Sequence, residues 1–388
     1  MLHNRVIVIC GDDWGRHPQT LEHMAKILAK SNRVIWVNSL GHRSPRFTLR
    51  DIRRMLEKLT VAIRTLATDR TDAHSSGVRV VCPLGIPFHN FRFIRRINAW
   101  ILQRLLLPIL REMNSGGPIL MVSSPVVVEL YGKLNETVRV YYCLDDYPAF
   151  DGALRTMAEL ERSTLSKVDA AFFVSQHLYD SRLEKPKHSM VMSQGVNVEH
   201  FDVRKSSNLH PLHVLRRPII GFMGWIAVWV DLDLIASCAR LRPDWTFALI
   251  GSSAVDLTPY SNIPNMHFLG PIPFDDLPEY ATSFDVGLIP FKVNPVTTAS
   301  NPLKLLEYFS MGIPVVSTPL PEVEKLKPHV EIASSPEETI AAIERSLSTR
   351  TGPLLAERFA IARQHTWESV LERQCDLIAL AEAEKASK

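Results

Sequence analysis

The sequence predicts an α/β protein made of two domains in series, each a parallel sheet with crossover helices. Three observations lead to this prediction. The chain has 388 residues, which exceeds the usual length of one domain. Hydrophobic residues make up 46% and charged residues 22%, a composition that can bury a large core. Short apolar runs alternate with longer amphipathic stretches, as strands alternate with crossover helices.

Seven apolar runs in the first half and five in the second are predicted strands. The first seven are expected at Val6–Cys10, Val34–Val37, Val78–Cys82, Ile119–Val122, Val138–Cys143, Ala170–Val174 and Met190–Met192. The pattern restarts at Ile219–Met223, Thr246–Ile250, Met266–Leu269, Val286–Ile289 and Val315–Ser317. Each run leads into turn residues or a helix-like segment, so each half is expected to be Rossmann-like.

The polar stretch from Phe201 to Pro218 contains two prolines and lacks clear periodicity, so residues 201–217 are the expected linker. The first domain is therefore expected at 1–200 and the second at 218–364. A helical pattern rich in Ala, Glu and Leu follows at 365–388. This C-terminal helix is a candidate to pack back on the first domain.

Cysteine usage and hydropathy exclude several classes of protein. Five scattered cysteines without a CxxC pair argue against a disulfide framework and a structural zinc site. The first apolar run is too short for a signal peptide, and no stretch of about 18 apolar residues occurs. We therefore expect a cytoplasmic protein without a spanning helix.

The segment TASNPLKLLEYFSMGIPVVST predicts a helix start suited to a phosphate. Ser300 or Asn301 can cap this helix, and Pro302 suits its first position. The free N–H groups and the helix dipole would favour an anion, so Ser300 and Asn301 become binding candidates.

Two charged residues follow on the same helix. Lys304 adds a positive charge in the first turn, and Glu307 lies on the same face, where its carboxylate could accept hydrogen bonds from ribose hydroxyls. One helix could thus bind the diphosphate and the ribose of a nucleotide. The alternative is an exposed ion pair on an ordinary helix.

That segment, with GFMGWIAVWVDLDLIASCARLRPDWTFALIG and HFLGPIPFDDLPEYATSFDVGLIPF, resembles GT-B glycosyltransferases of the glycosyltransferase-4-like, bacterial polysaccharide type. The resemblance covers the second domain almost completely and the first only loosely. It implies two Rossmann-like domains facing a central cleft, the first binding an acceptor and the second a nucleotide sugar. There is also some resemblance to the xanthan glucuronosyltransferase.

The resemblance also implies roles for individual residues. Lys304 would contact the donor phosphates and Glu307 the ribose. Gly224 and Trp225 would offer backbone groups to the diphosphate or sugar, and main-chain groups at Ile272 would frame the base. The resemblance implies a UDP-sugar rather than a GDP-sugar, and no metal or other cofactor.

The segment departs from the family pattern at two places. Retaining members often carry a glutamate at the position of Ala299, and many carry an Arg and a Lys where this chain reads GWIAVWVDLDL. The stereochemistry of transfer therefore stays open. The acids in that segment, Asp231 and Asp233, resemble a DxD metal motif, but they open a predicted helix, where a capping role is favoured.

Acidic residues follow two strands of the first domain. An inverting transfer needs a general base, and the loose resemblance to the xanthan enzyme makes Asp145 the preferred candidate; the alternative is that Asp145 and Asp146 cap the next turn. Asp13, Arg16 and His17 lie in the loop after the first strand and could contact acceptor or donor. That loop, GDDWG, lacks the GxGxxG spacing of dinucleotide-binding loops, which weakens an NAD interpretation.

Positive charge is concentrated in the first half: the net charge is +8 over 1–200 and −5 over 201–388. Residues 88–111 interleave aromatic and aliphatic side chains with five arginines, the composition of a helix on an anionic membrane surface. The alternatives are an ordinary surface helix, and binding to nucleic acid, which no recognisable module supports. We expect no nucleic-acid partner.

The patterns alone predict a two-domain α/β protein with a phosphate-binding helix near residue 302, and the resemblance implies a metal-independent glycosyltransferase of the hexosyltransferase type. It would move a sugar from a nucleotide diphosphate sugar to a glycan or lipid-linked acceptor in bacterial surface polysaccharide synthesis, peripherally at the inner face of the membrane. Two alternatives remain: a non-catalytic GT-B scaffold, and a GT-B-shaped nucleotide-sugar epimerase or hydrolase.

Overall fold

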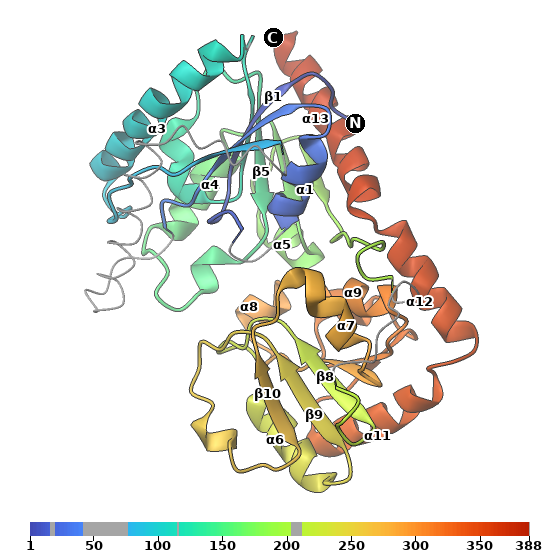
Figure 1. Ribbon diagram of the computed structural model, residues 1–388. Coiled ribbons are helices and arrows are strands. Elements are labelled where there is room, and N and C mark those ends of the chain that lie inside the picture. The colour runs from blue at the N-terminus through green and yellow to red at the C-terminus, as the bar shows by residue number, and fades with distance from the viewer. Residues whose placement is uncertain (16–19, 42–76, 115, 203–211, 388) are drawn as a thin grey trace. The chain divides into compact units, whose positions relative to one another are not determined.

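The computed structural model describes residues 1–388 except 16–19, 42–76, 115, 203–211 and 388. The chain divides into two compact units, one made of residues 1–192 with 370–388 and the other of residues 193–369 (Figure 1). The expected linker at 201–217 falls in the second unit by this division, and its residues 203–211 lie outside the described part.

Unit 1 contains a seven-stranded parallel sheet in the order β3-β2-β1-β4-β5-β6-β7. Its strands are β1 (Val6–Cys10), β2 (Arg33–Val37), β3 (Val78–Val81), β4 (Ile119–Val122), β5 (Val138–Cys143), β6 (Ala170–Phe173) and β7 (His188–Val191). Every residue of β1, β4 and β6 is buried. Helices on both faces explain why these strands are continuous apolar runs.

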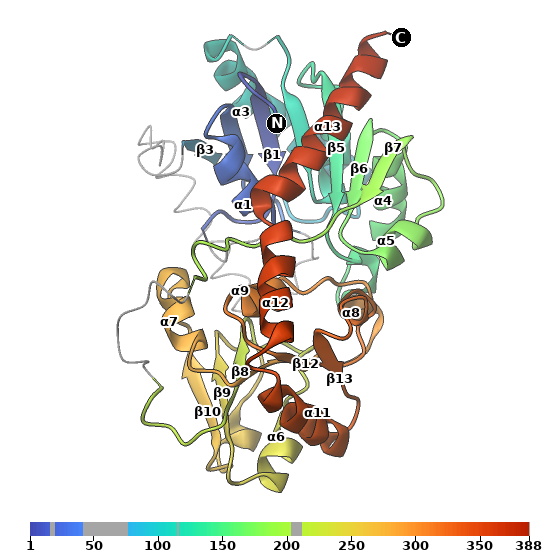
Figure 2. The same ribbon diagram turned by 90° about the vertical axis from the view of Figure 1, so that its right-hand side faces the viewer.

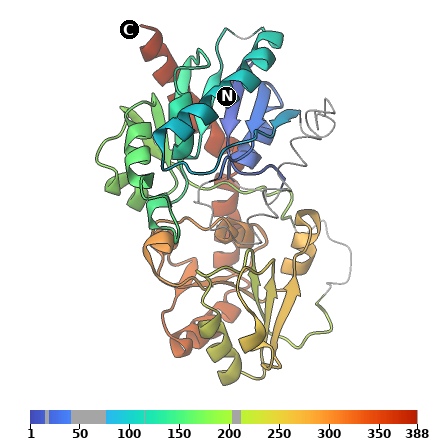
Figure 3. The same ribbon diagram turned by 90° about the vertical axis from the view of Figure 1, so that its left-hand side faces the viewer.

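The helical elements of unit 1 are α1 (Thr20–Leu28), α3 (Arg92–Glu112), η1 (Pro125–Leu130), η2 (Tyr147–Ala149), α4 (Met157–Leu165), α5 (Gln176–Ser181) and most of α13 (Trp367–Ala386). Neighbouring tyrosines of β5 show which helix covers which face, since successive strand residues point oppositely. The Tyr141 hydroxyl donates to Glu161 of α4 at 2.9 Å, and the Tyr142 hydroxyl donates to Gln374 of α13 at 3.0 Å. Figure 2 shows α13 across one face, and Figure 3 shows α3 across the other.

The C-terminal helix brings the end of the chain to the strands of unit 1. Arg5, just before β1, pairs with Glu382 of α13, and Lys385 pairs with Asp169 at 2.8 Å. Ile378 of α13 is fully buried. Both ends of the chain therefore contribute to the core of this unit.

Unit 2 contains a six-stranded parallel sheet in the order β10-β9-β8-β11-β12-β13. Its strands are β8 (Ile219–Met223), β9 (Thr246–Ile250), β10 (Met266–Gly270), β11 (Val286–Ile289), β12 (Val315–Ser317) and β13 (Val330–Ile332). The sheet and its helices share one hydrophobic core. Two parallel sheets with flanking helices confirm the predicted α/β fold class.

The helical elements of unit 2 are α6 (Leu232–Leu241), η4 (Thr258–Tyr260), η5 (Phe274–Asp276), α7 (Leu277–Ala281), α8 (Pro295–Thr298), α9 (Lys304–Ser310), α10 (Pro321–Glu324), α11 (Pro336–Ser348) and α12 (Pro353–Gln364). Helices α6 and α11 pack together, as do α9 and α12. Within the described residues, no helix is long and apolar enough to cross a bilayer.

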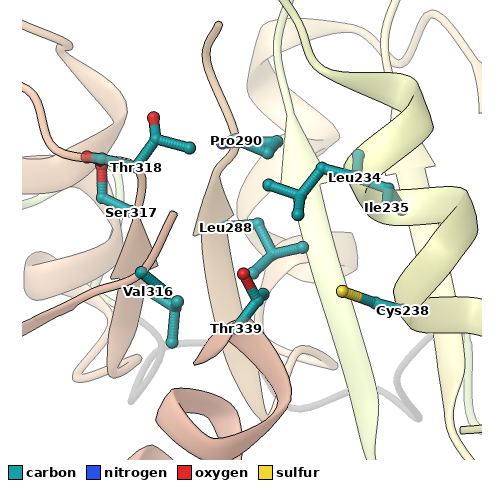
Figure 4. A pocket seen from close by; sticks show the side chains of 10 residues that line it. Leu234, Ile235, Cys238, Leu288, Pro290, Val316, Ser317, Thr318 and Thr339 are labelled. Carbon is teal, nitrogen blue, oxygen red and sulfur yellow. Dashed lines mark hydrogen bonds between the residues drawn. The ribbon is translucent and has the colours of Figure 1, made fainter. Parts of the chain in front are cut away.

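A small apolar cavity lies between β11, β12 and the α6–α11 pair (Figure 4). Leu288 of β11 points into it together with Cys238 of α6 and Thr339 of α11. The preceding residue, Gly287, faces the Tyr308 ring of α9 instead. The cavity is therefore a packing void on the face of the sheet opposite α9.

Candidate functional site

Helix α9 is fixed against the sheet of unit 2 by Tyr308, which is fully buried. The Met223 N–H donates to the Tyr308 hydroxyl at 3.1 Å. A Cβ on Gly287 would lie 2.8 Å from the Tyr308 ring, so only glycine lets the helix approach this closely. Lys304 lies one turn earlier on the same helix face and is thereby brought to the carboxyl edge of the sheet.

The start of α9 differs from the predicted start. The helix begins at Lys304, Leu303 occupies the cap position, and no side chain caps it. The Ser300 hydroxyl donates to the Thr297 carbonyl of α8 at 2.7 Å, and the Asn301 carbonyl accepts from Gln194. The prediction that Ser300 or Asn301 caps this helix is wrong, because both residues belong to the loop that closes α8.

Lys304 lies in an aromatic environment. Its Nζ is 4.6 Å from the ring centroid of Phe291 and 5.4 Å from that of Phe222. Lys304 and Glu307 are half-buried, and neither side chain has a hydrogen bond or ion pair to any described residue. The ion-pair alternative is thus not what the structure shows. Two charged groups with unused hydrogen-bonding capacity are suited to an external ligand.

Burial perturbs both charged groups. It lowers the pKa of the Lys304 ammonium and raises the pKa of the Glu307 carboxyl. The attraction between the two charges opposes both shifts but does not cancel them. A ligand that hydrogen-bonds to the ammonium and the carboxylate would stabilise both groups in their charged forms.

Three glycines form the carboxyl edge of the sheet beside Lys304. Gly224, Gly251 and Gly270 follow or end β8, β9 and β10, and all have positive φ angles, of 135°, 142° and 72°. A Cβ on Gly224 would lie 3.2 Å from the Lys304 Cε, and one on Gly251 would lie 1.9 Å from the Gly224 oxygen. At these three positions the edge presents backbone without a side chain, which lets a ligand approach closely.

The remaining predicted residues of unit 2 lie on loops at this edge. Ile272 is half-buried in the loop after β10. Trp225 directly follows Gly224 and is 47% exposed. Asp231 caps α6 by accepting from the Leu234 N–H at 3.1 Å, which confirms its predicted role. Among the described residues, no group of three His, Cys, Asp or Glu side chains could hold a metal ion.

In unit 1, Asp145 and Asp146 follow β5 but differ in their surroundings. Arg182 pairs with Asp146 at 2.8 Å and with Glu161 at 2.9 Å, and these three side chains are largely buried. Asp146 is therefore held by a structural network. Asp145 is half-buried, and its charge, with that of Asp12, raises the pKa of Tyr147 beyond the effect of burial.

Asp13 lines a small pocket at the carboxyl edge of the unit 1 sheet. The residues around it are Asp12, Asp13, Leu21, Glu22, Trp36, Ser123 and Leu144. They follow or adjoin β1, β4 and β5, so the loops after these strands meet here. The predicted residues Arg16 and His17 lie outside the described part of the chain.

Three residues near these sites were not predicted from the sequence. Phe291 flanks Lys304, Gly251 packs on Gly224, and Arg182 holds Asp146. Only Gly251 carries a local signal, because it directly follows a predicted strand, as Gly224 does. The other two act across the fold through contacts that no local pattern reports.

The second unit matches a known family. The sequence profile of the family "Glycosyl transferases group 1" matches residues 217–349, a range that includes Gly224, Lys304 and Glu307. Solved structures show the fold of the whole chain. It is similar to the sucrose-phosphate synthase of Thermosynechococcus elongatus, with 15% identity, 98% of this chain and 100% of that chain covered, and a TM-score of 0.71. The whole chain therefore has the two-domain GT-B fold, and the sequence of its second unit is similar to that of group 1 glycosyl transferases.

Two further proteins are similar to this chain, one over nearly its whole length and one over less than half of it. Anabaena HepE in complex with UDP and glucose has a TM-score of 0.67 at 14% identity, with 97% of this chain and 100% of that chain covered. TuaH of Bacillus subtilis (strain 168), named as a candidate glycosyltransferase of teichuronic acid biosynthesis, is 29% identical over 178 residues. This match covers 41% of the chain and 45% of TuaH, less than half of either protein.

Proposed function

We propose that the protein transfers a sugar from a nucleotide diphosphate sugar, of the UDP type, to a glycan or lipid-linked acceptor in bacterial surface polysaccharide synthesis. The observation that carries this proposal is the half-buried pair Lys304 and Glu307, which has no hydrogen-bonding partner among the described residues. The ammonium suits a diphosphate and the carboxylate suits a ribose diol. The UDP in the HepE structure and the biosynthetic role given to TuaH support the choice of donor and pathway class.

The proposed reaction breaks one bond and forms one bond. The bond from the sugar C1 to the diphosphate oxygen breaks, and a bond from C1 to the acceptor oxygen forms. Lys304 stabilises the charge that develops on the departing diphosphate, the role that a metal has in other enzymes. In an inverting reaction, Asp145 takes the proton of the acceptor hydroxyl, and Arg182 keeps Asp146 engaged in its own ion pairs.

A transfer assay tests this proposal. The protein is incubated with radiolabelled UDP-glucose, UDP-glucuronic acid or GDP-mannose, with and without a lipid extract of bacterial membranes. We expect label to enter the lipid fraction only when the extract is present, and Asp145→Asn to lower the rate by about 10²- to 10⁴-fold without changing donor affinity. Asp151→Asn, an exposed acid outside the site, is the control.

Other outcomes of the assay have defined meanings. Free sugar or an epimerised donor without extract would identify a hydrolase or epimerase instead. Donor binding without any product would favour a non-catalytic scaffold. Full transfer by Asp145→Asn would contradict the assignment of the base.

We also propose that α3 holds the protein on an anionic membrane surface. Phe93, Ile97 and Trp100 form a stripe along α3 and are 61%, 39% and 54% exposed, whereas Arg95 on the opposite face is buried. An ordinary surface helix would bury such apolar side chains and expose the arginine. Arg104 lies over the Trp100 ring at 5.4 Å, a cation beside an aromatic, as at membrane interfaces.

Sedimentation with lipid vesicles tests the membrane proposal. We expect binding to vesicles rich in phosphatidylglycerol, weaker binding at high salt, and a loss of about tenfold in Phe93→Ser/Trp100→Ser. Leu241→Ser removes an equally exposed apolar side chain from α6 and serves as the control. Equal binding by the double variant and wild type would overturn the proposal.

A further inference from the structure

Two loops at the carboxyl edge of the unit 2 sheet form one rigid tip, residues 224–230 after β8 and 290–294 after β11. The Asp231 N–H donates to the Pro290 carbonyl at 2.7 Å, and the Lys292 N–H donates to the Trp229 carbonyl at 2.8 Å. An antiparallel bridge joins Val230 to Phe291. The tip is thus held by backbone hydrogen bonds and presents its side chains in a defined arrangement.

Large apolar side chains dominate the surface of this tip. Trp225, Val228 and Val293 are 47%, 68% and 56% exposed. The Trp225 ring meets Trp229 edge-on, with centroids 5.2 Å apart, so one indole braces the other. Trp229 is itself partly buried against the core of unit 2, so Trp225 is the exposed member of the pair. Exposed apolar side chains gathered in one place are typical of a contact site.

The tip adjoins Lys304 from both of its loops. Gly224, directly before Trp225, is the residue whose added Cβ would touch the Lys304 side chain. Phe291, from the other loop, places its ring 4.6 Å from the Lys304 Nζ. Any ligand group that follows a phosphate held at Lys304 therefore meets this tip next.

The strand order indicates which ligand group that is. Along the edge the strands follow the order β10, β9, β8, β11. A nucleotide sugar with its base at Ile272 after β10 and its diphosphate at Gly224 after β8 carries its sugar onward, over the loops after β8 and β11. Trp225 lies at the start of the loop after β8, where the next residue, Ile226, pairs with Ser253 of the loop after β9. Its indole meets Trp229, whose carbonyl accepts from the Lys292 N–H of the loop after β11.

We infer that the indole of Trp225 is the platform for the sugar ring of the donor, an inference that rests on the proposed function. The C–H groups on one face of a pyranose pack against an aromatic ring by dispersion and desolvation, while its hydroxyls remain free for hydrogen bonds. Residues 225–230 read WIAVWV and include no basic residue. Lys304 therefore supplies the positive charge, and Trp225 binds the sugar through its uncharged surface.

The test compares the affinities for a nucleotide sugar and for its free nucleotide. Titration calorimetry is done with UDP against UDP-glucose and UDP-glucuronic acid, and with GDP against GDP-mannose, on wild type and Trp225→Ala. We expect Trp225→Ala to weaken the best-bound nucleotide sugar by about 3- to 10-fold and to change free nucleotide affinity by less than about twofold. Trp225→Phe should retain most of the affinity, and Leu241→Ala is the exposed apolar control.

Each other result counts against the inference. An equal loss for nucleotide sugar and free nucleotide would place the indole on the nucleotide. Unchanged affinities in Trp225→Ala would show that it contacts no part of the donor, while the proposed function would stand. Absence of any nucleotide binding by wild type would overturn the proposed function and this inference together.

Discussion

Lys304 and Glu307 are each pushed towards the neutral form by burial, in opposite directions on the pH scale. The Lys304 ammonium loses its proton at a lower pH than usual, and the Glu307 carboxyl keeps its proton to a higher pH than usual. A nucleotide sugar needs both groups charged, and its own diphosphate does not titrate near neutrality. The pair would therefore bind the donor in a restricted pH window.

We predict that donor affinity passes through a maximum with pH. The affinity should rise with pH as Glu307 loses its proton around its raised pKa. Above the lowered pKa of Lys304, the affinity should fall by up to about tenfold per pH unit. Calorimetric titrations from pH 5 to 10 measure the profile. Lys304→Arg, which stays charged, should lose the alkaline fall, and Glu307→Gln should lose the acid rise. An alkaline fall that persists in Lys304→Arg would assign it to another group.

At the scale of the element, the turns after β8 and β9 depend on two glycines in contact. A side chain on Gly251 would meet the Gly224 carbonyl oxygen at 1.9 Å, a backbone atom that cannot rotate away. Gly270, at the end of β10, also has a positive φ angle, but nothing lies within 4 Å of an added Cβ. Gly251 therefore combines a clash with a φ angle of 142°, whereas Gly270 has a φ angle of 72° and no clash.

We predict that Gly251→Ala destabilises the protein by about 3 kcal/mol or more, since strain and clash add. Gly270→Ala should cost only about 1–2 kcal/mol, the ordinary penalty of that backbone region. Urea unfolding followed by circular dichroism gives both values. Similar values for the two variants would show that the turns can move apart.

The elements themselves were largely predictable from the sequence, because buried parallel strands are continuous apolar runs. Val286–Ile289 and Val315–Ser317 were predicted to the residue. The strand Val330–Ile332 was missed, since it is short, includes a glutamate and is partly exposed at the sheet edge. The start of α9 was misplaced because the Ser300 hydroxyl bonds to the end of α8 instead of capping α9, and the N-terminal cap of α8 is Asn294.

The arrangement of the candidate site was predictable where sequence spacing sets it, as for Lys304 and Glu307 on one helix. It was not predictable where function depends on contacts between strands. The packing of Gly251 on Gly224 and of Phe291 beside Lys304 joins residues far apart in the chain. The difference between Asp145 and Asp146 likewise depends on Arg182, which reaches Asp146 from beyond another strand.

At the scale of the whole molecule, both ends of the chain belong to the same unit, because residues 370–388 complete the unit that residues 1–192 build. Ile378 of α13 is fully buried in unit 1, whereas Leu380, two residues on, is 60% exposed. We predict that Ile378→Asp destabilises unit 1 by several kcal/mol, because it buries an unpaired charge. Leu380→Asp should stay within about 0.5 kcal/mol of wild type.

Thermal unfolding followed by near-ultraviolet circular dichroism compares these two variants. Equal stabilities would mean that the end of α13 is dispensable for unit 1. A selective loss in Ile378→Asp would show that unit 1 is stable only with both chain segments in place.

The central claim is that Lys304 and Glu307 bind the diphosphate and ribose of a nucleotide sugar. The most direct measurement is the rise in the unfolding temperature of the full chain with UDP, GDP or NAD, for wild type beside Lys304→Ala. A ligand that binds the native state stabilises it by an amount set by its concentration over Kd, about 2.7 kcal/mol at one hundred times Kd. We predict a rise with UDP that Lys304→Ala abolishes. No rise with UDP or GDP, a rise with NAD alone, or an undiminished rise in Lys304→Ala would contradict the claim.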